Sequence, residues 1–494
     1  MNTPGREPSL MLSLVPLLAM FVILMVGRLY LDYRIEPLIL SSAVIAGFAA
    51  WYLRCPWQPL EEAILAKIDV AMGGMLIIFS VGCMVGAWMF CGTVPFMVYW
   101  GMQLVDPHYM LLSAFLICTL VSVCTGTSWG SAATIGVAMI GIAQGLGIPL
   151  APVAGAALSG CYVGDKLSPL SDTTNLAPAV AGATTYEHIG HMLHTTIPGT
   201  ILCCIIFFFA SSTVTGDLHT PAQVQDFMNQ LTEIYDLNIL LVIPPLLLIA
   251  GSVLRWPILP TIVLTTFFSL ALGCFIQGFD LRWGILATTT GFKISMTDYL
   301  ATPSAAVQGL LNRGGMMGVL ENMGMLCVAM AFGGIMHGSG MLTVVLQRML
   351  KRVRTDGGLI VTTLLSCVVL CFSTGSAYMG ILIPGALFKE SYLKRCLHPK
   401  NLSRALEDSA TMLDGAIPWA SGAVYMSGVL GVSAFDYVPW MVFNLSSVFI
   451  GLFCAIVGIG IVKITPEDAR RRLEEAKLDT SLPGEAAAGV RVAA

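Results

Sequence analysis

The stretch GDKLSPLSDTTNLAP, residues 164–178, interrupts an otherwise apolar segment with two aspartates, a lysine and several hydroxyl side chains. A helix cannot continue undisturbed through Pro169, because proline lacks the backbone N–H and clashes with the preceding turn. If the helix enters a bilayer near Pro152, a rise of about 1.5 Å per residue places Asp165 roughly 20 Å deep. A charge there costs about 2.5 kcal/mol or more unless it has a partner, water or a bound ion. The stretch therefore predicts a broken membrane helix with an ion site.

A cytoplasmic loop with solvated charges is the competing interpretation of these residues. Two observations oppose it: the following apolar run, 176–185, is too short to span a bilayer alone, and a second broken segment, EDSATMLDGAIPWASG, occupies residues 407–422. Asp414 lies deep in this second segment. Glu407 and Asp408 lie closer to a basic loop, where the solvated interpretation is stronger.

The composition indicates that most of this chain lies within a lipid bilayer. Of its 494 residues, 56% are hydrophobic and 11% are charged, and the mean hydropathy is +0.81. Soluble domains are about 45–50% apolar and about 25% charged. The fourteen cysteines mostly lie in apolar runs without the paired spacing of a zinc site, so we interpret them as core residues. Nucleic acid is not an expected partner, and the sequence has no P-loop motif through which ATP would drive the protein.

Apolar runs and their breaks predict an all-α polytopic membrane protein with two sets of five spans. Each set also contains one longer apolar stretch, at 109–148 and 358–388. The first set of spans lies near residues 9–27, 38–53, 69–91, 150–186 and 195–215, and the second near 237–253, 257–279, 316–337, 403–435 and 439–463.

The two sets resemble each other in sequence. The breaks in the long stretches read CTGTSWGS (124–131) and STGSAYMG (373–380), each with a Thr-Gly pair in the same place. The acidic residues also recur with equal spacing, so we predict an internal duplication. The acidic pairs matched in this way are Asp165 with Glu407 and Asp172 with Asp414.

The duplication divides the chain into four parts. Residues 1–215 are expected to form the first repeat and 237–463 the second, joined by a polar external linker at 216–236. Residues 464–494 are expected to form a cytoplasmic tail that begins as a short charged helix.

Basic residues predict the orientation of the repeats. Both flanks of the 358–388 stretch are rich in Lys and Arg, whereas the flanks of 109–148 have none. Because cytoplasmic loops carry the positive charge, each stretch should begin and end on one side, as a re-entrant hairpin. Five full spans per repeat then give two inverted repeats, broken helices at the midplane and cytoplasmic termini. The expected location is a bacterial inner membrane.

Oxygen-rich side chains at the breaks and hairpin tips predict a Na⁺ site, because unpaired carbonyls, hydroxyls and carboxylates can replace the hydration shell of a hard cation. Asp172 is the first candidate for the exchanging carboxylate, Asp165 the second and Asp414 the third. Na⁺ is expected at Asp172 and Asp165. Lys166 is either a switchable ion-pair partner or a neutralising charge. The other candidate ion-binding residues are Asn175, Thr173, Ser171, Thr125, Thr127, Ser128, Thr374 and Ser376.

Three histidines, His188, His191 and His194, recur every three residues. Their spacing differs from His-Glu-x-x-His, so we expect an interfacial helix, with pH sensing as the alternative. An intramembrane aspartyl protease is a remote alternative for the whole chain, because residue 162 of Tyr-Val-Gly-Asp is not glycine and no Pro-Ala-Leu element occurs. We expect no enzyme activity and no cofactor.

Two motifs, GTSWGSAATIG (126–136) and GDKLSPLSDTTNLAPAVAG (164–182), closely resemble the NhaC-type sodium/proton antiporters of the ion-transporter superfamily. The resemblance implies inverted repeats, re-entrant hairpins and a transport domain that moves against a dimerising scaffold in the lipid bilayer. It also implies a homodimer and exchange of Na⁺ for H⁺. The family includes proton- and sodium-coupled malate/lactate exchangers, so a small carboxylate is the alternative substrate. Only Lys166 would be available to bind it.

Overall fold

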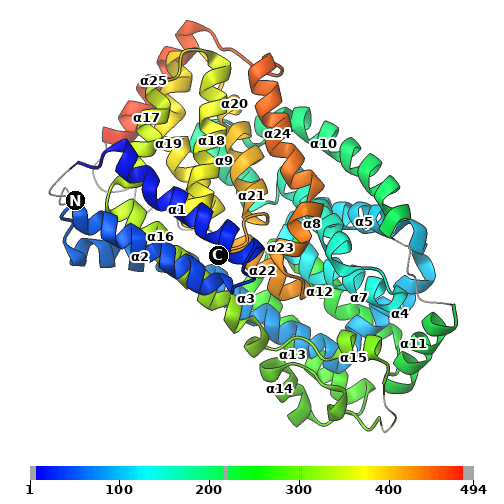
Figure 1. Ribbon diagram of the computed structural model, residues 1–494. Coiled ribbons are helices and arrows are strands. Elements are labelled where there is room, and N and C mark those ends of the chain that lie inside the picture. The colour runs from blue at the N-terminus through cyan, green and yellow to red at the C-terminus, as the bar shows by residue number, and fades with distance from the viewer. Residues whose placement is uncertain (1–6, 215–220, 300, 302, 482–494) are drawn as a thin grey trace.

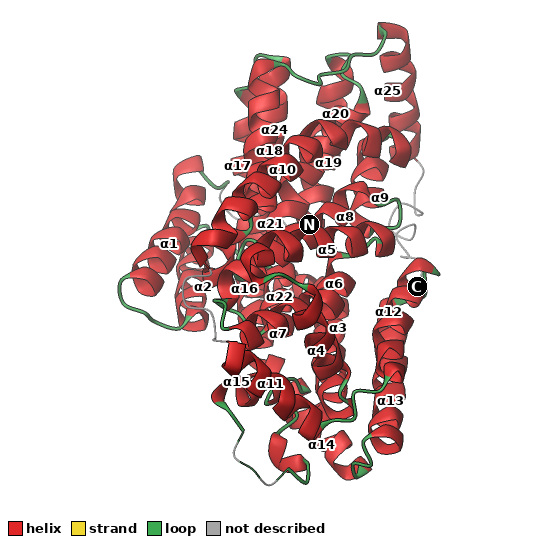
Figure 2. Cartoon of the chain, turned by 90° about the vertical axis from the view of Figure 1, so that its right-hand side faces the viewer, coloured by secondary structure: helices red, strands yellow, loops and turns green. Residues whose placement is uncertain are grey.

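Helices account for all the regular secondary structure in the part of the chain that the computed structural model describes, residues 7–214, 221–299, 301 and 303–481 (Figures 1 and 2). A single isolated bridge there joins Leu397 and Lys463. The prediction of an all-α protein is confirmed for these residues.

The first half of the chain begins with two helices that pair with each other and ends with one long helix. Its α-helices are α1 (Leu10–Leu29), α2 (Ile35–Tyr52), α3 (Trp57–Cys91), α4 (Thr93–Leu104), α5 (Met110–Thr125), α6 (Ser128–Ser131), α7 (Val137–Leu146), α8 (Leu150–Leu167), α9 (Asp172–Ala181) and α10 (Thr185–Val214). A 3₁₀ turn, η1 (Pro107–Tyr109), precedes α5, and a π-helical turn, η2 (Ala132–Gly136), joins α6 to α7.

The second half starts beyond residue 220 and ends with a charged helix. Its α-helices are α11 (Pro221–Ile234), α12 (Ile243–Val253), α13 (Ile258–Ile276), α14 (Leu281–Thr290), α15 (Ala305–Leu311), α16 (Leu320–Gly338), α17 (Met341–Lys351), α18 (Asp356–Thr374), α19 (Ala377–Lys394), α20 (Pro399–Leu406), α21 (Met412–Asp414), α22 (Ser421–Leu430), α23 (Ala434–Tyr437), α24 (Val442–Val457) and α25 (Pro466–Ser481). The shorter turns are η3 (Ile239–Val242), η4 (Ile294–Met296), η5 (Met316–Val319), the π-helical η6 (Glu407–Thr411) and η7 (Val438–Trp440).

Nine helices in the described part of the chain are long and apolar enough to cross a bilayer, or eleven if each of two bent pairs counts as one span. One bent pair joins residues 222–234 to 239–253 at 100°, and the other joins 434–440 to 442–457 at 57°. The chain is therefore a multi-pass membrane protein.

The predicted hairpin at 358–388 is formed by α18 and α19. Its tip is Gly375, whose φ of 61° lies in the left-handed region that favours glycine. The two ends of the hairpin meet, because the Arg395 guanidinium lies 3.4 Å from the Asp356 carboxylate and donates to the Val353 carbonyl at 3.2 Å. The chain thus enters and leaves this segment at one place.

The stretch 109–148 also folds back on itself, with its tip at Gly126 (φ 71°). Helix α5 runs parallel to α8: the Ser122 hydroxyl donates to the Cys161 carbonyl, and Gly160 packs on Phe115. Since α8 begins directly after α7 ends, α7 must run back toward the start of α5. Helix α11 contacts the end of α7, and α25 contacts α19. Figures 1 and 2 place α11 and α25 at opposite ends of the molecule.

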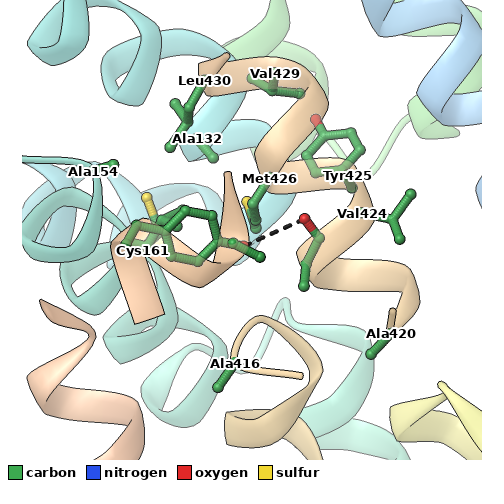
Figure 3. Packing of buried hydrophobic residues seen from close by; sticks show 14 of the residues in the cluster. Ala132, Ala154, Cys161, Ala416, Ala420, Val424, Tyr425, Met426, Val429 and Leu430 are labelled. Carbon is green, nitrogen blue, oxygen red and sulfur yellow. Dashed lines mark hydrogen bonds between the residues drawn. The ribbon is translucent and has the colours of Figure 1, made fainter. Parts of the chain in front are cut away.

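The two halves share one hydrophobic core. Trp129 stacks on Tyr425 with ring centroids 4.2 Å apart, and the Tyr425 hydroxyl donates to the Trp129 carbonyl at 2.9 Å. Figure 3 shows small residues from both halves, among them Ala132 and Ala420, around Met426. Small residues let helix backbones approach closely in a membrane, where packing and hydrogen bonds hold helices together.

The predicted linker and tail contain more helix than expected. Within 216–236, α11 is helical and residues 216–220 lie outside the described part of the chain. In the tail, α25 confirms the expected charged helix, while residues 482–494 lie outside the described part. The Arg472 guanidinium of α25 donates to the Gly182 carbonyl at the end of α9, at 3.2 Å.

The shared ends of the hairpins predict a labelling pattern. On a background without native cysteines, Arg352→Cys and Lys394→Cys should react with an impermeant maleimide from one side of the membrane only. Asp106→Cys and Asp226→Cys should react only from the other side. All four side chains are exposed. Reaction of Arg352→Cys and Lys394→Cys from opposite sides would show that α18 and α19 cross the membrane in succession.

Candidate functional site

The helix that carries the decisive stretch is broken as predicted. Helix α8 ends at Leu167, and α9 begins at Asp172, with Pro169 in the gap. The Asn175 amide holds the break by donating to the carbonyls of Pro169 at 2.9 Å and Ser171 at 2.8 Å. The Asn175 amide nitrogen is thereby bound to the backbone of the break, and its Oδ1 accepts from the Thr185 hydroxyl at 3.0 Å.

Asp165 lies at this break and is 8% exposed. Its carboxylate accepts a hydrogen bond from the backbone N–H of Ser128 at 3.1 Å and one from the Ser171 hydroxyl at 3.3 Å. Ser128 is the first residue of the helix that leaves the first hairpin tip, and the positive end of a helix dipole favours an anion. Asp165 thus joins the hairpin tip to the broken helix.

Asp414 is held in the same way in the second half and is also 8% exposed. Its carboxylate accepts from the Ser421 hydroxyl at 3.1 Å and lies near the backbone N–H groups of Gly422 and Ala377. Ala377 is the first residue after the second hairpin tip, as Ser128 is after the first.

The contacts with the hairpin tips therefore match Asp165 with Asp414, whereas the spacings along the sequence matched Asp172 with Asp414. The distance along the sequence from the tip glycine Gly126 to Asp165 is the same as that from the tip glycine Gly375 to Asp414. The earlier pairing relied on spacings along one helix, whereas the contacts with the hairpin tips define the equivalent positions.

Both hairpin tips touch the breaks. A Cβ at Gly126 would meet Leu170 and would lie 2.9 Å from Ser168 Oγ, and one at Gly375 would lie 3.0 Å from the Trp419 carbonyl oxygen. The Ser421 backbone N–H also donates to the Gly375 carbonyl at 2.9 Å. Each tip and its break thus form one packed unit.

This packing predicts that Gly126→Ala lowers the exchange rate by about tenfold or more, because it adds a steric clash to the strain of a left-handed residue. Gly458→Ala is the matched control, since Gly458 has a φ of 85° but no atom within 4 Å of an added Cβ. Its rate should stay within about twofold of wild type in vesicles with equal protein content. Equal losses in both variants would mean that backbone strain alone is responsible.

Other candidate residues lie around these two units. Asp172 is exposed at the start of α9, and the Thr173 hydroxyl lies 3.2 Å from that of Ser171. Most hydroxyls at the tips make contacts within their own hairpin. The Thr125 hydroxyl lies 3.1 Å from that of Ser131, and the Thr127 hydroxyl accepts from the Gly130 N–H at 3.3 Å. The Thr374 hydroxyl donates to the Leu370 carbonyl at 2.7 Å. Ser376 precedes α19 at the second tip.

Lys166 forms a buried ion pair across the halves. Its Nζ lies 2.6 Å from the Asp408 carboxylate, and the two side chains are 0% and 1% exposed. Asp408 also accepts from the Thr195 hydroxyl at 2.8 Å, and Arg404 lies 3.9 Å from it. Lys166 is thus neutralised by a residue of the other half. No spacing in the sequence indicates this partner.

Two of the three histidines are buried between elements. His188 Nδ1 lies 2.9 Å from the Ser403 hydroxyl. The ring nitrogens of His191 lie 3.0 Å and 2.6 Å from the carbonyl oxygens of Lys400 and Gly460. His194 is exposed. These contacts fix α10 against α20 and the segment after α24. A role in pH sensing stays a prediction.

Two tyrosines near the carboxylates are not among the predicted site residues. Tyr378, one residue after the start of α19, is 44% exposed and lies within electrostatic range of Asp165, Asp172, Asp414 and Glu407. The buried Tyr162 hydroxyl has no hydrogen-bond partner in the described part of the chain and faces Gly415. In the part of the chain that the structure describes, no group of three or more His, Cys, Asp or Glu side chains is arranged to hold a metal ion.

Broken helices, paired hairpins and buried carboxylates in a multi-pass helical protein define a membrane transporter. The family model described as "Na+/H+ antiporter family" matches residues 160–459, and the chain belongs to this family. An uncharacterized Na⁺/H⁺ antiporter of Haemophilus influenzae is 38% identical over 93% of this chain and 98% of its own length.

Two further relatives carry different activities in their names. The Na⁺/H⁺ antiporter NhaC of Alkalihalophilus pseudofirmus is 33% identical over 86% of this chain and 91% of its own length. The malate-2H⁺/Na⁺-lactate antiporter of Bacillus subtilis is also 33% identical, over 90% of this chain and 94% of its own length.

Proposed function

We propose that this chain exchanges Na⁺ for H⁺ across the membrane by alternating access, with Asp165 as the principal ion-binding carboxylate. The observation that carries the proposal is the position of Asp165: it is buried, and both the hairpin tip and the broken helix bind it. A carboxylate with hydroxyl and carbonyl neighbours suits Na⁺, and the same oxygen atoms can hold a proton instead. Competition between the two ions at one site couples their opposite movements.

Asp414 occupies the matching position in the second half, and we assign it the equivalent role there. Asp172 is exposed beside the first break, where its charge would attract the cation as it approaches. Ser171, which already contacts Asp165, would supply a neutral oxygen ligand.

The arrangement proposed for the membrane follows from the two hairpins. Their shared ends point to opposite ends of the molecule, which supports inverted repeats at 1–215 and 237–463 joined by an external linker, with both termini and the tail 464–494 in the cytoplasm. Location in a bacterial inner membrane and assembly as a homodimer complete the proposal. The basic flanks of 358–388 support this orientation.

Exchange of a small carboxylate is the second candidate, since the helix N-termini after the hairpin tips could bind an anion. The charges of the site oppose it. The two buried cations, Lys166 and Arg404, both lie beside Asp408. A ligand bound at the breaks would instead lie next to the carboxylates of Asp165 and Asp414. The geometry therefore favours a cation.

Fluorescence measurement of ΔpH in everted vesicles tests the function. NaCl should collapse an imposed ΔpH in vesicles that contain the protein, and vesicles without it provide the control. LiCl, KCl and malate added separately define the selectivity. Collapse by malate together with no response to NaCl alone would replace Na⁺/H⁺ exchange by carboxylate exchange.

A further inference from the structure

Glu407 is a buried carboxylate that makes no hydrogen bond of normal geometry with the described residues. It is 0% exposed, and neither of its oxygen atoms has a partner in the described part of the chain. It begins the π-helical turn η6, and such turns are frequent at functional sites. An unsatisfied buried charge is costly, so this side chain requires an explanation.

The surroundings of Glu407 come from both halves. The hydroxyls of Thr173 and Thr411 face its carboxylate, and Asp165 and Lys166 lie within electrostatic range. The Thr411 hydroxyl is buried and, like Glu407, has no partner of normal hydrogen-bond geometry among the described residues. Three neighbouring buried oxygen atoms of Glu407 and Thr411 thus lack a hydrogen bond of normal geometry among the described residues, and one ligand could bind all three.

Asp165 and Asp414 differ from Glu407 in this respect. Asp165 accepts hydrogen bonds from the Ser128 backbone N–H and the Ser171 hydroxyl, and Asp414 accepts one from the Ser421 hydroxyl. Lys166 is not the ion-pair partner of Glu407, because its ammonium group lies 2.6 Å from the Asp408 carboxylate. Among the buried carboxylates of the described residues, Glu407 is thus the one with no hydrogen bond of normal geometry to either oxygen atom.

The charges around Glu407 indicate the class of this ligand. Both buried cations near the breaks, Lys166 and Arg404, lie beside Asp408, at 2.6 Å and 3.9 Å from its carboxylate. No ion pair among the described residues includes Glu407, so a bound cation would balance a negative charge on it. Hydroxyl and carboxylate oxygens are ligands for a hard cation such as Na⁺.

A chain of hydroxyl contacts links Glu407 to Asp165. The Ser171 hydroxyl donates to Asp165 at 3.3 Å and lies 3.2 Å from the Thr173 hydroxyl, which faces Glu407. Asp165, Ser171 and Thr173 belong to the first half of the chain, and Glu407 and Thr411 to the second.

We propose that Glu407 is a ligand of the transported Na⁺, assisted by Thr411, so that one ion is held between Asp165 of the first half and Glu407 of the second. The inference rests on the Na⁺/H⁺ exchange proposed above. Binding of the ion would draw the two halves together at the breaks. Release would leave two carboxylates that require protons, which couples the return step to H⁺.

Glu407→Gln tests this role with a nearly isosteric change. The apparent KM for Na⁺ in everted vesicles should rise by about 10- to 100-fold, because a charged ligand is lost. Thr411→Val should raise it by about three- to tenfold. Thr265→Val is the matched control, since its buried hydroxyl donates only to its own helix, to the Thr261 carbonyl at 2.8 Å.

Thermal unfolding of the purified protein separates ligand binding from a structural role. Wild-type protein should melt at a higher temperature in Na⁺ than in choline, because a bound ion stabilises the folded state. Glu407→Gln should melt at the wild-type temperature or above in choline and lose most of the increase with Na⁺. A Na⁺-induced increase and a KM both within twofold of wild type would overturn the assignment of Glu407. A wild-type protein without any response to Na⁺ would instead overturn the proposed exchange, and the Na⁺ ligand with it.

Discussion

Asp165→Asn should abolish Na⁺-dependent collapse of ΔpH in everted vesicles while the protein still inserts and folds. Asparagine keeps the size of the side chain but cannot take up and release a proton, and its amide is a weaker ligand for Na⁺ than a carboxylate. The Ser128 N–H and the Ser171 hydroxyl can still donate to the amide oxygen, so the break should keep its shape. Fluorescence traces at several Na⁺ concentrations measure the effect, with membrane content determined by immunoblot.

Asp172→Asn provides the comparison for that result. Asp172 is exposed, so loss of its charge should only raise the Na⁺ concentration needed for half-maximal exchange, by about three- to tenfold. Wild-type exchange in Asp165→Asn together with complete loss in Asp172→Asn would make Asp172 the exchanging carboxylate in place of Asp165, as the sequence predicts.

Asp408→Asn should destabilise the folded protein by about 3–5 kcal/mol, because it leaves Lys166 and Arg404 buried without their carboxylate. Lys166→Met should cost less, since Arg404 stays beside Asp408 and the methionine keeps the packing on Phe443, whose ring centroid lies 5.4 Å from Lys166 Nζ. Unfolding in detergent, followed by loss of tryptophan fluorescence or by melting temperature, measures both changes.

An exposed ion pair of similar length serves as the control for Asp408→Asn. Lys394 Nζ lies 2.8 Å from the Glu390 carboxylate, and their side chains are 64% and 58% exposed. Glu390→Gln should change the free energy of unfolding by no more than about 1 kcal/mol, because water screens that pair. Equal losses in Asp408→Asn and Glu390→Gln would show that burial adds nothing to the Lys166–Asp408 interaction.

Local sequence chemistry was sufficient to predict where the membrane helices break. Pro169 lacks a backbone donor, and Gly126 and Gly375 adopt left-handed conformations that other residues avoid, so each break has a cause within a few residues. The same reasoning predicted the hairpins, because the basic residues on both flanks of 358–388 require a common side.

Contacts between distant segments could not be predicted in this way. The partner of Lys166 lies in the other half, and the equivalence of Asp165 and Asp414 follows from hairpin-tip contacts that no spacing along one helix reveals. Helices α4 and α17 were also missed. Helix α17 is amphipathic, and α4 directly follows α3 after Gly92, so neither stands out as a separate apolar run of spanning length.

The separation of Lys166 from Asp408 by 242 residues has a consequence for biosynthesis. At about 5–20 residues per second, a ribosome needs roughly 12–50 s to supply the second residue after the first. During this interval a fully inserted first half would hold the Lys166 ammonium group inside the bilayer without its counter-ion. Membrane insertion of α8 should therefore stay incomplete, with Lys166 in contact with water or the insertion machinery, until α20 and η6 have been translated.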